Sequence, residues 1–115
     1  MDCEGGDLDK AAQFWGQALG YEVMPLVDPA DEQYRQLDTG PNSLHIEVQR
    51  VDHPSRVHID IETDDIEAEV RRLEGLGAKR LGQVRTWCVM EAPTGHRFCV
   101  VRQQHGAFED TANQW

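Results

Sequence analysis

The 115-residue sequence has no apolar run near the length of a membrane span, and its first residues do not resemble a signal peptide. Its three cysteines, Cys3, Cys88 and Cys99, form no Cys-x-x-Cys pair. An odd number of separated cysteines argues against a disulfide framework and favours reduced thiols. We therefore expect a cytoplasmic protein that spans no membrane.

Basic residues are scarce beside acidic ones. Eleven Lys and Arg stand against 21 Asp and Glu, which gives a formal net charge of −10 at pH 7. This balance argues against nucleic acid and anionic membrane surfaces as partners, because both carry negative charge. It is compatible with a cationic small ligand, or with solubility alone. The sequence also lacks a phosphate loop, a nucleotide fingerprint and a nucleophile–base motif, so its function must be sought in other patterns.

The stretch from Val57 to Ala78 carries the clearest pattern in the chain. Its first six residues alternate between apolar and polar types, which predicts a strand with one apolar and one polar face. The polar face comprises His58, Asp60 and Glu62. Three polar side chains on one face of a strand indicate a wet or functional surface.

A helix is expected directly after this strand. Apolar residues recur there at helical spacing, with charged residues between them. They are Ile66, Val70, Leu73 and Leu76. Thr63 or Asp64 can act as N-cap, with Glu67 placed to complete a capping box, and Gly77 is placed to end the helix.

The same order of elements occurs twice. In the first half, Met1 to Cys3 can end a strand, and Asp7 can cap a helix that runs to about Leu19 before Gly20. Further strands are expected over residues 21–27, 33–38 and 44–50, and in the second half over 79–84, 85–91 and 96–103. A shift of 57 residues places Asp7 on Asp64 and Gly20 on Gly77. Each half therefore reads βαβββ, and repeated units of this kind share a core.

This duplication resembles the vicinal oxygen chelate superfamily, which holds the glyoxalases, extradiol dioxygenases and bleomycin resistance proteins. The motifs behind the resemblance are DLDKAAQFWGQALGYEV, RVHIDIETDDIEAEVRRLEGLGA and MEAPTGHRFCVVR, and glyoxalase-like domain proteins are the most similar members. The resemblance covers residues 1–103, as halves 1–50 and 57–103, and leaves 104–115 as a C-terminal tail. It implies an α+β fold of two βαβββ modules that form a curved sheet cleft with helices outside, and a C2 homodimer.

The resemblance also implies a divalent metal (Zn, Fe, Mn or Ni) held by the first and last strands of the two halves. At those positions the sequence offers His58 and Glu47, with Cys99 where the family usually has Glu. Met1 stands at the fourth position and is no ordinary ligand for a hard divalent ion. We expect a degenerate site in which His58, Glu47 and Cys99 could hold zinc with a water, or a pocket without metal.

The predicted function is the binding of a small molecule in the cleft between the modules. The expected lining residues are His45, Glu47, His58, Asp60, Trp87 and Cys99. Plainer interpretations stay open: His58 can be a strand histidine hydrogen-bonded to Asp60, Trp87 a core residue, and Cys99 a small buried hydrophobe. The alternative function is a divalent-metal-dependent lyase, isomerase or dioxygenase that uses His58 and Glu47. A third possibility is a structural or interaction protein without a ligand site.

Overall fold

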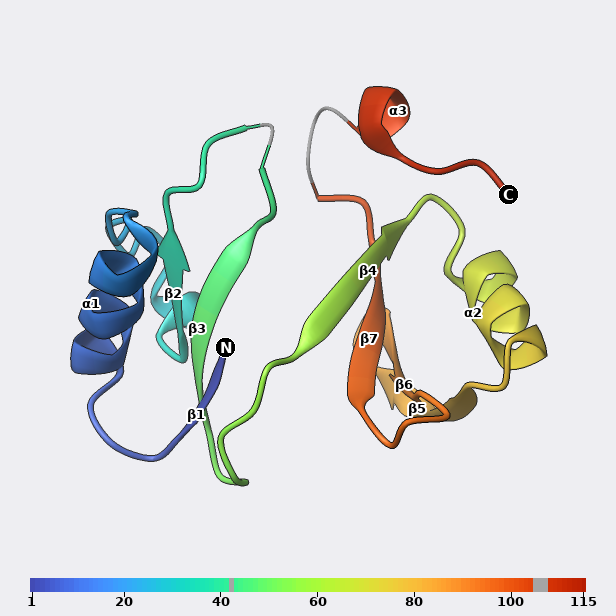
Figure 1. Cartoon of the computed structure of the whole chain (residues 1–115), viewed down its shortest axis with the longest axis horizontal. Helices are drawn as coiled ribbons and strands as arrows, with labels where there is room; N and C mark the ends of the chain where they lie inside the picture. Colours follow the sequence, from blue (N-terminus) through green and yellow to red (C-terminus); the bar gives the residue numbers. More distant parts are fainter. Residues whose placement is uncertain (42, 105–107) are drawn as a thin grey trace. The chain divides into compact units, whose positions relative to one another are not determined.

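The computed structural model describes residues 1–41, 43–104 and 108–115. The chain divides into two compact units, Met1–Val57 and His58–Trp115. Each unit is a small mixed sheet with a helix packed on one face, as Figure 1 shows. The structure defines each unit by itself, so the cleft predicted between the two halves stays a prediction.

The first unit contains a three-stranded sheet in the order β1-β3-β2. Its elements are β1 (Asp2–Glu4), α1 (Leu8–Leu19), the short 3-10 helix η1 (Pro29–Asp31), β2 (Tyr34–Leu37) and β3 (Ile46–Val51). β3 lies in the middle, parallel to β1 and antiparallel to β2. One face of β3 packs against α1, and α1 does not cover the other face.

The predicted ends of α1 are confirmed. The Asp7 carboxylate accepts from the backbone N–H groups of Asp9 and Lys10, which satisfies donors that the first turn of a helix leaves unpaired. Gly20 ends the helix in the left-handed conformation, with φ 80°. The buried face of α1 packs through Leu8 and Ala12 against Val48 of β3.

The strand predicted over residues 21–27 is wrong except at one point. Val23 forms an isolated antiparallel bridge to Leu37, supported by a 2.8 Å hydrogen bond from Met24 N to Gln36 O. Pro25 follows directly and has no N–H to continue a ladder. The segment therefore ends its pairing there, and Val27 is 91% exposed.

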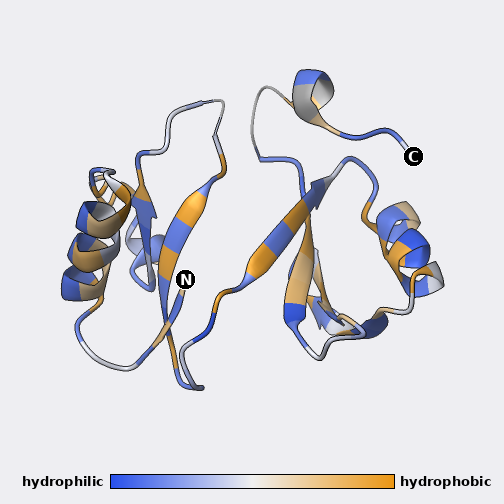
Figure 2. Ribbon diagram, in the orientation of Figure 1, coloured by the Kyte–Doolittle hydropathy of each residue, from blue (hydrophilic) through white to orange (hydrophobic). Residues whose placement is uncertain are grey.

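The second unit contains a four-stranded sheet in the order β4-β7-β6-β5. Its elements are β4 (Ile59–Thr63), α2 (Ile66–Gly75), β5 (Lys79–Val84), β6 (Trp87–Glu91), β7 (Arg97–Arg102) and α3 (Phe108–Thr111). β4 is parallel to β7, and the β6 pairs with β5 and β7 are antiparallel. Figure 2 shows the alternation of hydrophobic and hydrophilic residues along β4 and β3.

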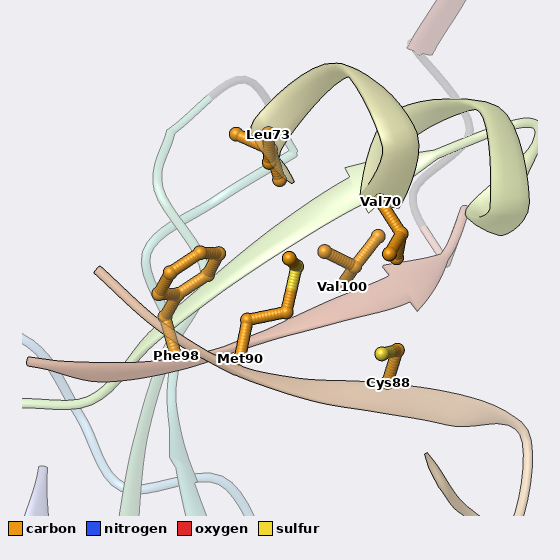
Figure 3. Packing of buried hydrophobic residues seen from close by; sticks show 6 residues of the cluster. All are labelled: Val70, Leu73, Cys88, Met90, Phe98 and Val100. Carbon is orange, nitrogen blue, oxygen red and sulfur yellow. The ribbon is translucent and has the colours of Figure 1, made fainter. Parts of the chain in front are cut away.

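One face of the second sheet packs against α2. Figure 3 shows six buried side chains that form this core: Val70, Leu73, Cys88, Met90, Phe98 and Val100. Of the predicted apolar face of β4, only Ile61 packs against the cluster, while Val57 and Ile59 are more than half exposed. Leu76 is 67% exposed as well, because α2 ends before it.

The predicted N-cap of α2 is wrong by one residue. Asp65 caps the helix, accepting from the backbone N–H of Ala68 at 3.0 Å. Thr63 instead accepts from Asp65 N at 3.2 Å and so orders the turn before the cap, and Glu67 pairs with Arg80 rather than completing a capping box. The N-caps Asp7 and Asp65 are thus 58 residues apart, whereas Gly20 and Gly77, both with positive φ, keep the predicted spacing of 57.

Two smaller features complete the second unit. Arg85 and Thr86 form the turn between β5 and β6, with Arg85 at φ 51°, so the strand predicted from residue 85 begins at Trp87. The ring of Trp115 in the tail makes a cation–π contact with α2, because the guanidinium carbon of Arg72 lies 4.1 Å from its centroid.

Within the described ranges, no helix is long and apolar enough to cross a bilayer.

Candidate functional site

The face of the second sheet that turns away from α2 carries the candidate site. Cys88, Met90, Phe98 and Val100 pack toward the helix. Because successive side chains on a strand alternate between faces, Trp87 and Cys99 point to the opposite face. Asp60 pairs with Cys99 in the parallel register of β4 and β7 and shares that face. The predicted residues His58, Asp60, Trp87 and Cys99 therefore belong to one surface.

Three of these residues form a compact cluster. His58 directly precedes β4, two residues before Asp60, and its Nε2 lies 3.2 Å from Asp60 Oδ1. Cys99 comes from β7, the neighbouring strand. One ligand atom from each of His58, Asp60 and Cys99 lies within 4.8 Å of the other two. Strand alternation and strand pairing thus bring an imidazole, a carboxylate and a thiol to one point.

The cluster sits partly out of water. The side chain of His58 is 20% exposed and Cys99 is 7% exposed, while the Asp60 side chain is 53% exposed. The pKa of His58 is raised to about 9, first by the hydrogen bond from its ring to Asp60 and next by its hydrogen bond with Cys99. Burial opposes this shift without overcoming it. The imidazole is therefore protonated at neutral pH in the metal-free protein. The 3.2 Å contact confirms the expected pairing of His58 with Asp60.

The open face of the first sheet holds a second histidine–carboxylate pair. His45 Nε2 lies 3.0 Å from Glu47 Oε1, and His45 Nδ1 lies 3.3 Å from Gln36 Nε2. Gln36 and Glu47 are partners in the antiparallel register of β2 and β3. Val48 packs toward α1, so Glu47 faces away from the helix. His45 and Glu47 thus lie together on an open sheet face of the first unit.

Met1 is not on the open face. Its side chain packs against the cluster of Leu8, Ala12 and Val48 under α1, and its amino group donates to the backbone oxygen of Glu47 at 2.7 Å. The predicted correspondence between Met1 and His58 therefore fails, because the two side chains lie on opposite faces of their sheets. The β1 register, with Asp2 opposite Gln49, is what turns Met1 toward the helix.

Of the three predicted metal ligands, His58 and Cys99 lie close together, and Asp60 lies beside them. Glu47 belongs to the first unit, where it pairs with His45. Asp60 was expected to bind ligand rather than metal. The signal for its role was the His-x-Asp spacing on a strand, which places both side chains on one face.

The donor set of the cluster fits a divalent metal. Imidazole nitrogen, thiolate sulfur and carboxylate oxygen are the ligands that zinc binds at about 2.0–2.3 Å, which puts ligand atoms roughly 3.3–3.8 Å apart in a tetrahedral site. The observed separations, up to 4.8 Å, exceed that spacing by about 1 Å. His58 must release its proton to bind a metal, so metal binding at this cluster is coupled to pH.

Comparisons with known proteins accord with this fold. A family model described as glyoxalase-like domain matches residues 1–101. Among solved structures, the chain is similar to a methylmalonyl-CoA epimerase in complex with methylmalonyl-CoA and NH4+, at 16% identity and a TM-score of 0.56, over 89% of this chain and 90% of that one. It is also similar to the trypanothione-dependent glyoxalase I of Leishmania major, at 20% identity and a TM-score of 0.39, over 89% and 83% of the two chains.

A third similar structure is a glyoxalase/bleomycin resistance protein/dioxygenase family enzyme from Burkholderia phytofirmans PsJN. It shares 14% identity and a TM-score of 0.39, over 89% of this chain and 94% of that one. At these identities the likeness shows the fold alone. The family model and the observed elements confirm the α+β fold of the glyoxalase-like family predicted from the sequence. No curated protein matches the chain.

Proposed function

Because the chain belongs to the glyoxalase-like domain family, we propose that it binds a small molecule on the face of its second sheet that α2 does not cover, around His58, Asp60 and Cys99. The convergence of these three side chains within 4.8 Å is the observation that carries the proposal. Such convergent polar groups are typical of ligand sites.

The surface around the cluster suits an aromatic or cationic ligand. Trp87 and Val89 of β6 and Val101 of β7 lie on the same face by strand alternation; Trp87 and Val89 are half-buried, and Val101 is buried. They form an apolar surface beside the cluster of His58, Asp60 and Cys99. Asp60 and Glu62 add two carboxylates, which favour a cation. A flat molecule with a positive group would contact both the apolar side chains and the carboxylates.

A thermal-shift screen tests this proposal. Chelator-treated protein is screened with a panel of small aromatic amines, and each compound that raises the melting temperature is tested again with His58→Gln and Trp87→Leu. We expect both variants to lose the shift, because a ligand stabilises only the state that it binds. His96→Gln is the matched control, since His96 is an exposed histidine of the same unit that contacts Thr94 rather than the cluster. Shifts that survive in His58→Gln and Trp87→Leu would count against this site.

The same cluster favours a second candidate function, a divalent-metal-dependent lyase, isomerase or dioxygenase. His58, Asp60 and Cys99 would hold the ion, and the thiolate and imidazole favour zinc over the harder Mn²⁺. A bound ion would supply Lewis acidity toward an oxygen of the substrate. The protein's own part is to hold three ligands on two paired strands and to keep Cys99 out of bulk water.

Metal analysis separates the two candidates. Protein purified without chelator is analysed by inductively coupled plasma mass spectrometry, alongside His58→Gln, Asp60→Asn and Cys99→Ser. A metal-dependent enzyme requires about one transition metal per chain in the wild type and much less in each variant, with His45→Gln in the first unit unchanged. A wild-type protein without stoichiometric metal would remove this candidate and leave the metal-free binding function.

A further inference from the structure

A surface cavity of about 550 Å³, widely open to solvent, lies in the first unit, where β3 ends and the chain turns toward residue 53. Its lining includes Gln33, Gln49, Arg50, Asp52 and His53. The volume is within the range of small-molecule sites. None of the lining residues belongs to the His58 cluster, so this cavity needs its own explanation.

The wall of this cavity is held in place by buried contacts. Asp2 is 5% exposed, and its carboxylate accepts from Arg56 Nε at 3.2 Å. The backbones of Asp2 and Arg56 exchange two hydrogen bonds, of 2.9 and 3.1 Å. His53 Nε2 lies 3.7 Å from Asp2 Oδ2, so both ends of the loop from 53 to 56 contact β1. A wall fixed in this way binds a ligand at a lower entropic cost than a mobile loop would.

One part of the lining presents hydrogen-bond donors. Arg50 Nε donates to Gln33 Oε1 at 3.2 Å, and Arg50 N donates to Gln33 O at 3.0 Å. These bonds fix the guanidinium and orient the Gln33 amide. Within the described part of the chain, the terminal nitrogens of Arg50 and the Nε2 of Gln33 have no other partner. A guanidinium beside an amide N–H is suited to a carboxylate.

Another part of the lining presents an acceptor. Asp52 lines the same cavity, and its carboxylate forms no hydrogen bond or ion pair among the described residues. A carboxylate is suited to an ammonium group.

From these two sets of groups we propose that the cavity binds a small zwitterion of the amino-acid class. Its carboxylate binds Arg50 and Gln33, and its ammonium binds Asp52. A zwitterion fits better than a simple anion, because the chain carries a net charge of −10 and repels free anions. It also fits better than a simple cation, which would leave the Arg50 guanidinium facing a like charge.

Titration of the full, isotope-labelled chain by two-dimensional ¹H–¹⁵N NMR tests this proposal. The probes are L-alanine, L-glutamine and L-phenylalanine, with N-acetyl-L-alanine and L-alaninamide as analogues that each lack one charge. We expect saturable shifts of the backbone amide signals of residues 49–53 with at least one amino acid. Each single-charge analogue should bind about tenfold more weakly or worse than L-alanine or fail to bind, because it loses one charge-assisted pair.

Two variants that each remove one charge test which side chains bind the ligand. Arg50→Gln and Asp52→Asn should each weaken binding about tenfold or more while leaving the remaining spectrum in place, which shows that the unit is still folded. Arg97→Gln and Asp64→Asn are the matched controls, since both residues are exposed in the second unit, and they should leave binding unchanged. The proposal is overturned if no amino acid gives saturable shifts, or if both variants bind as tightly as the wild type. These outcomes are independent of the site at His58, which the thermal-shift screen tests.

Discussion

At the scale of single residues, His58 has the most distinctive environment in the second unit. Its ring lies between Asp60 and Cys99, and its side chain is mostly out of water. Hydrogen bonds to both partners stabilise the imidazolium and outweigh the cost of burial. The ring therefore stays protonated well above the pH at which an ordinary histidine becomes neutral.

The titration of His58 can be followed by NMR of its ring protons in chelator-treated protein. We expect an inflection near pH 9, in line with the raised pKa. Asp60→Asn should lower the pKa most, because the hydrogen bond to Asp60 is the largest cause of the shift, and Cys99→Ala should lower it less. Asp64→Asn removes an exposed carboxylate of the same unit and should leave the inflection in place. An equal response to all three substitutions would contradict this origin of the shift.

The same shift links stability to pH. The folded pKa of about 9 lies above the ordinary histidine value of 6.5, so the contribution of His58 is fully present below pH 6.5 and is lost as the pH rises through 9. We expect the free energy of unfolding of chelator-treated wild type to exceed that of His58→Gln by ~1–2 kcal/mol at pH 6, a figure reduced because Asp60 is half exposed. Urea denaturation at pH 6 and pH 10 measures the difference, which should shrink at the higher pH. A difference that stays constant would show that His58 contributes through packing instead.

At the scale of elements, the start of α2 gives a test with an internal control. Asp65 caps the helix, while Asp64, directly before it, is exposed. Asp65→Ala should lower the free energy of unfolding by about 1 kcal/mol, because the N–H of Ala68 loses its acceptor. Asp64→Ala should change it by less than about 0.5 kcal/mol. Chemical denaturation measures both, and the reverse order would restore the N-cap that the sequence predicted.

The end of α2 gives a second test, with opposite signs at two glycines. Gly77 has φ 102°, and a Cβ there would lie 3.2 Å from Pro93 Cγ, so Gly77→Ala should destabilise by about 1–2 kcal/mol. Gly75 lies in the last turn of α2, and an added Cβ would meet nothing within 4 Å. Gly75→Ala should stabilise by roughly 0.5 kcal/mol, because it lowers the entropy of the unfolded chain. Thermal unfolding of both variants checks the signs, and two changes of the same sign would refute this reading of the helix end.

At the scale of the whole molecule, the family resemblance predicts a C2 homodimer. The second sheet ends in β5, whose Leu81 and Val84 are each 45% exposed, and such edges can pair with a second copy. Light scattering after size-exclusion chromatography should give about twice the chain mass of 13.1 kDa. Leu81→Lys should shift the mass toward the monomer, whereas Val27→Lys, at an exposed site of the first unit, serves as the control. A wild-type mass of one chain would refute the dimer.

Much of the local structure was predictable from the sequence. The Asp7 cap and the left-handed Gly20 follow from nearest-neighbour chemistry, and the alternation from Val57 to Glu62 is a property of the strand alone. The strand over 21–27 failed, because β pairing requires a partner and an N–H, and Pro25 lacks the second. The N-cap of α2 was displaced by one residue, since three candidate caps stand in a row and the end of β4 decides among them.

Apart from residues 21–27 and the short helices η1 and α3, the sequence by itself determined the order of helices and strands. It also determined the polar face of β4 and the placement of His58 beside Asp60, because these depend on contacts between near neighbours in the chain. Only the tertiary structure decided that Cys99 is the third member of the cluster, through the parallel pairing of β4 with β7. It also decided that Met1 packs under α1 instead of joining the open face, and that Arg50 and Asp52 line one cavity. Strand register fixes these outcomes, and register is set by the fit of whole sheets against their helices.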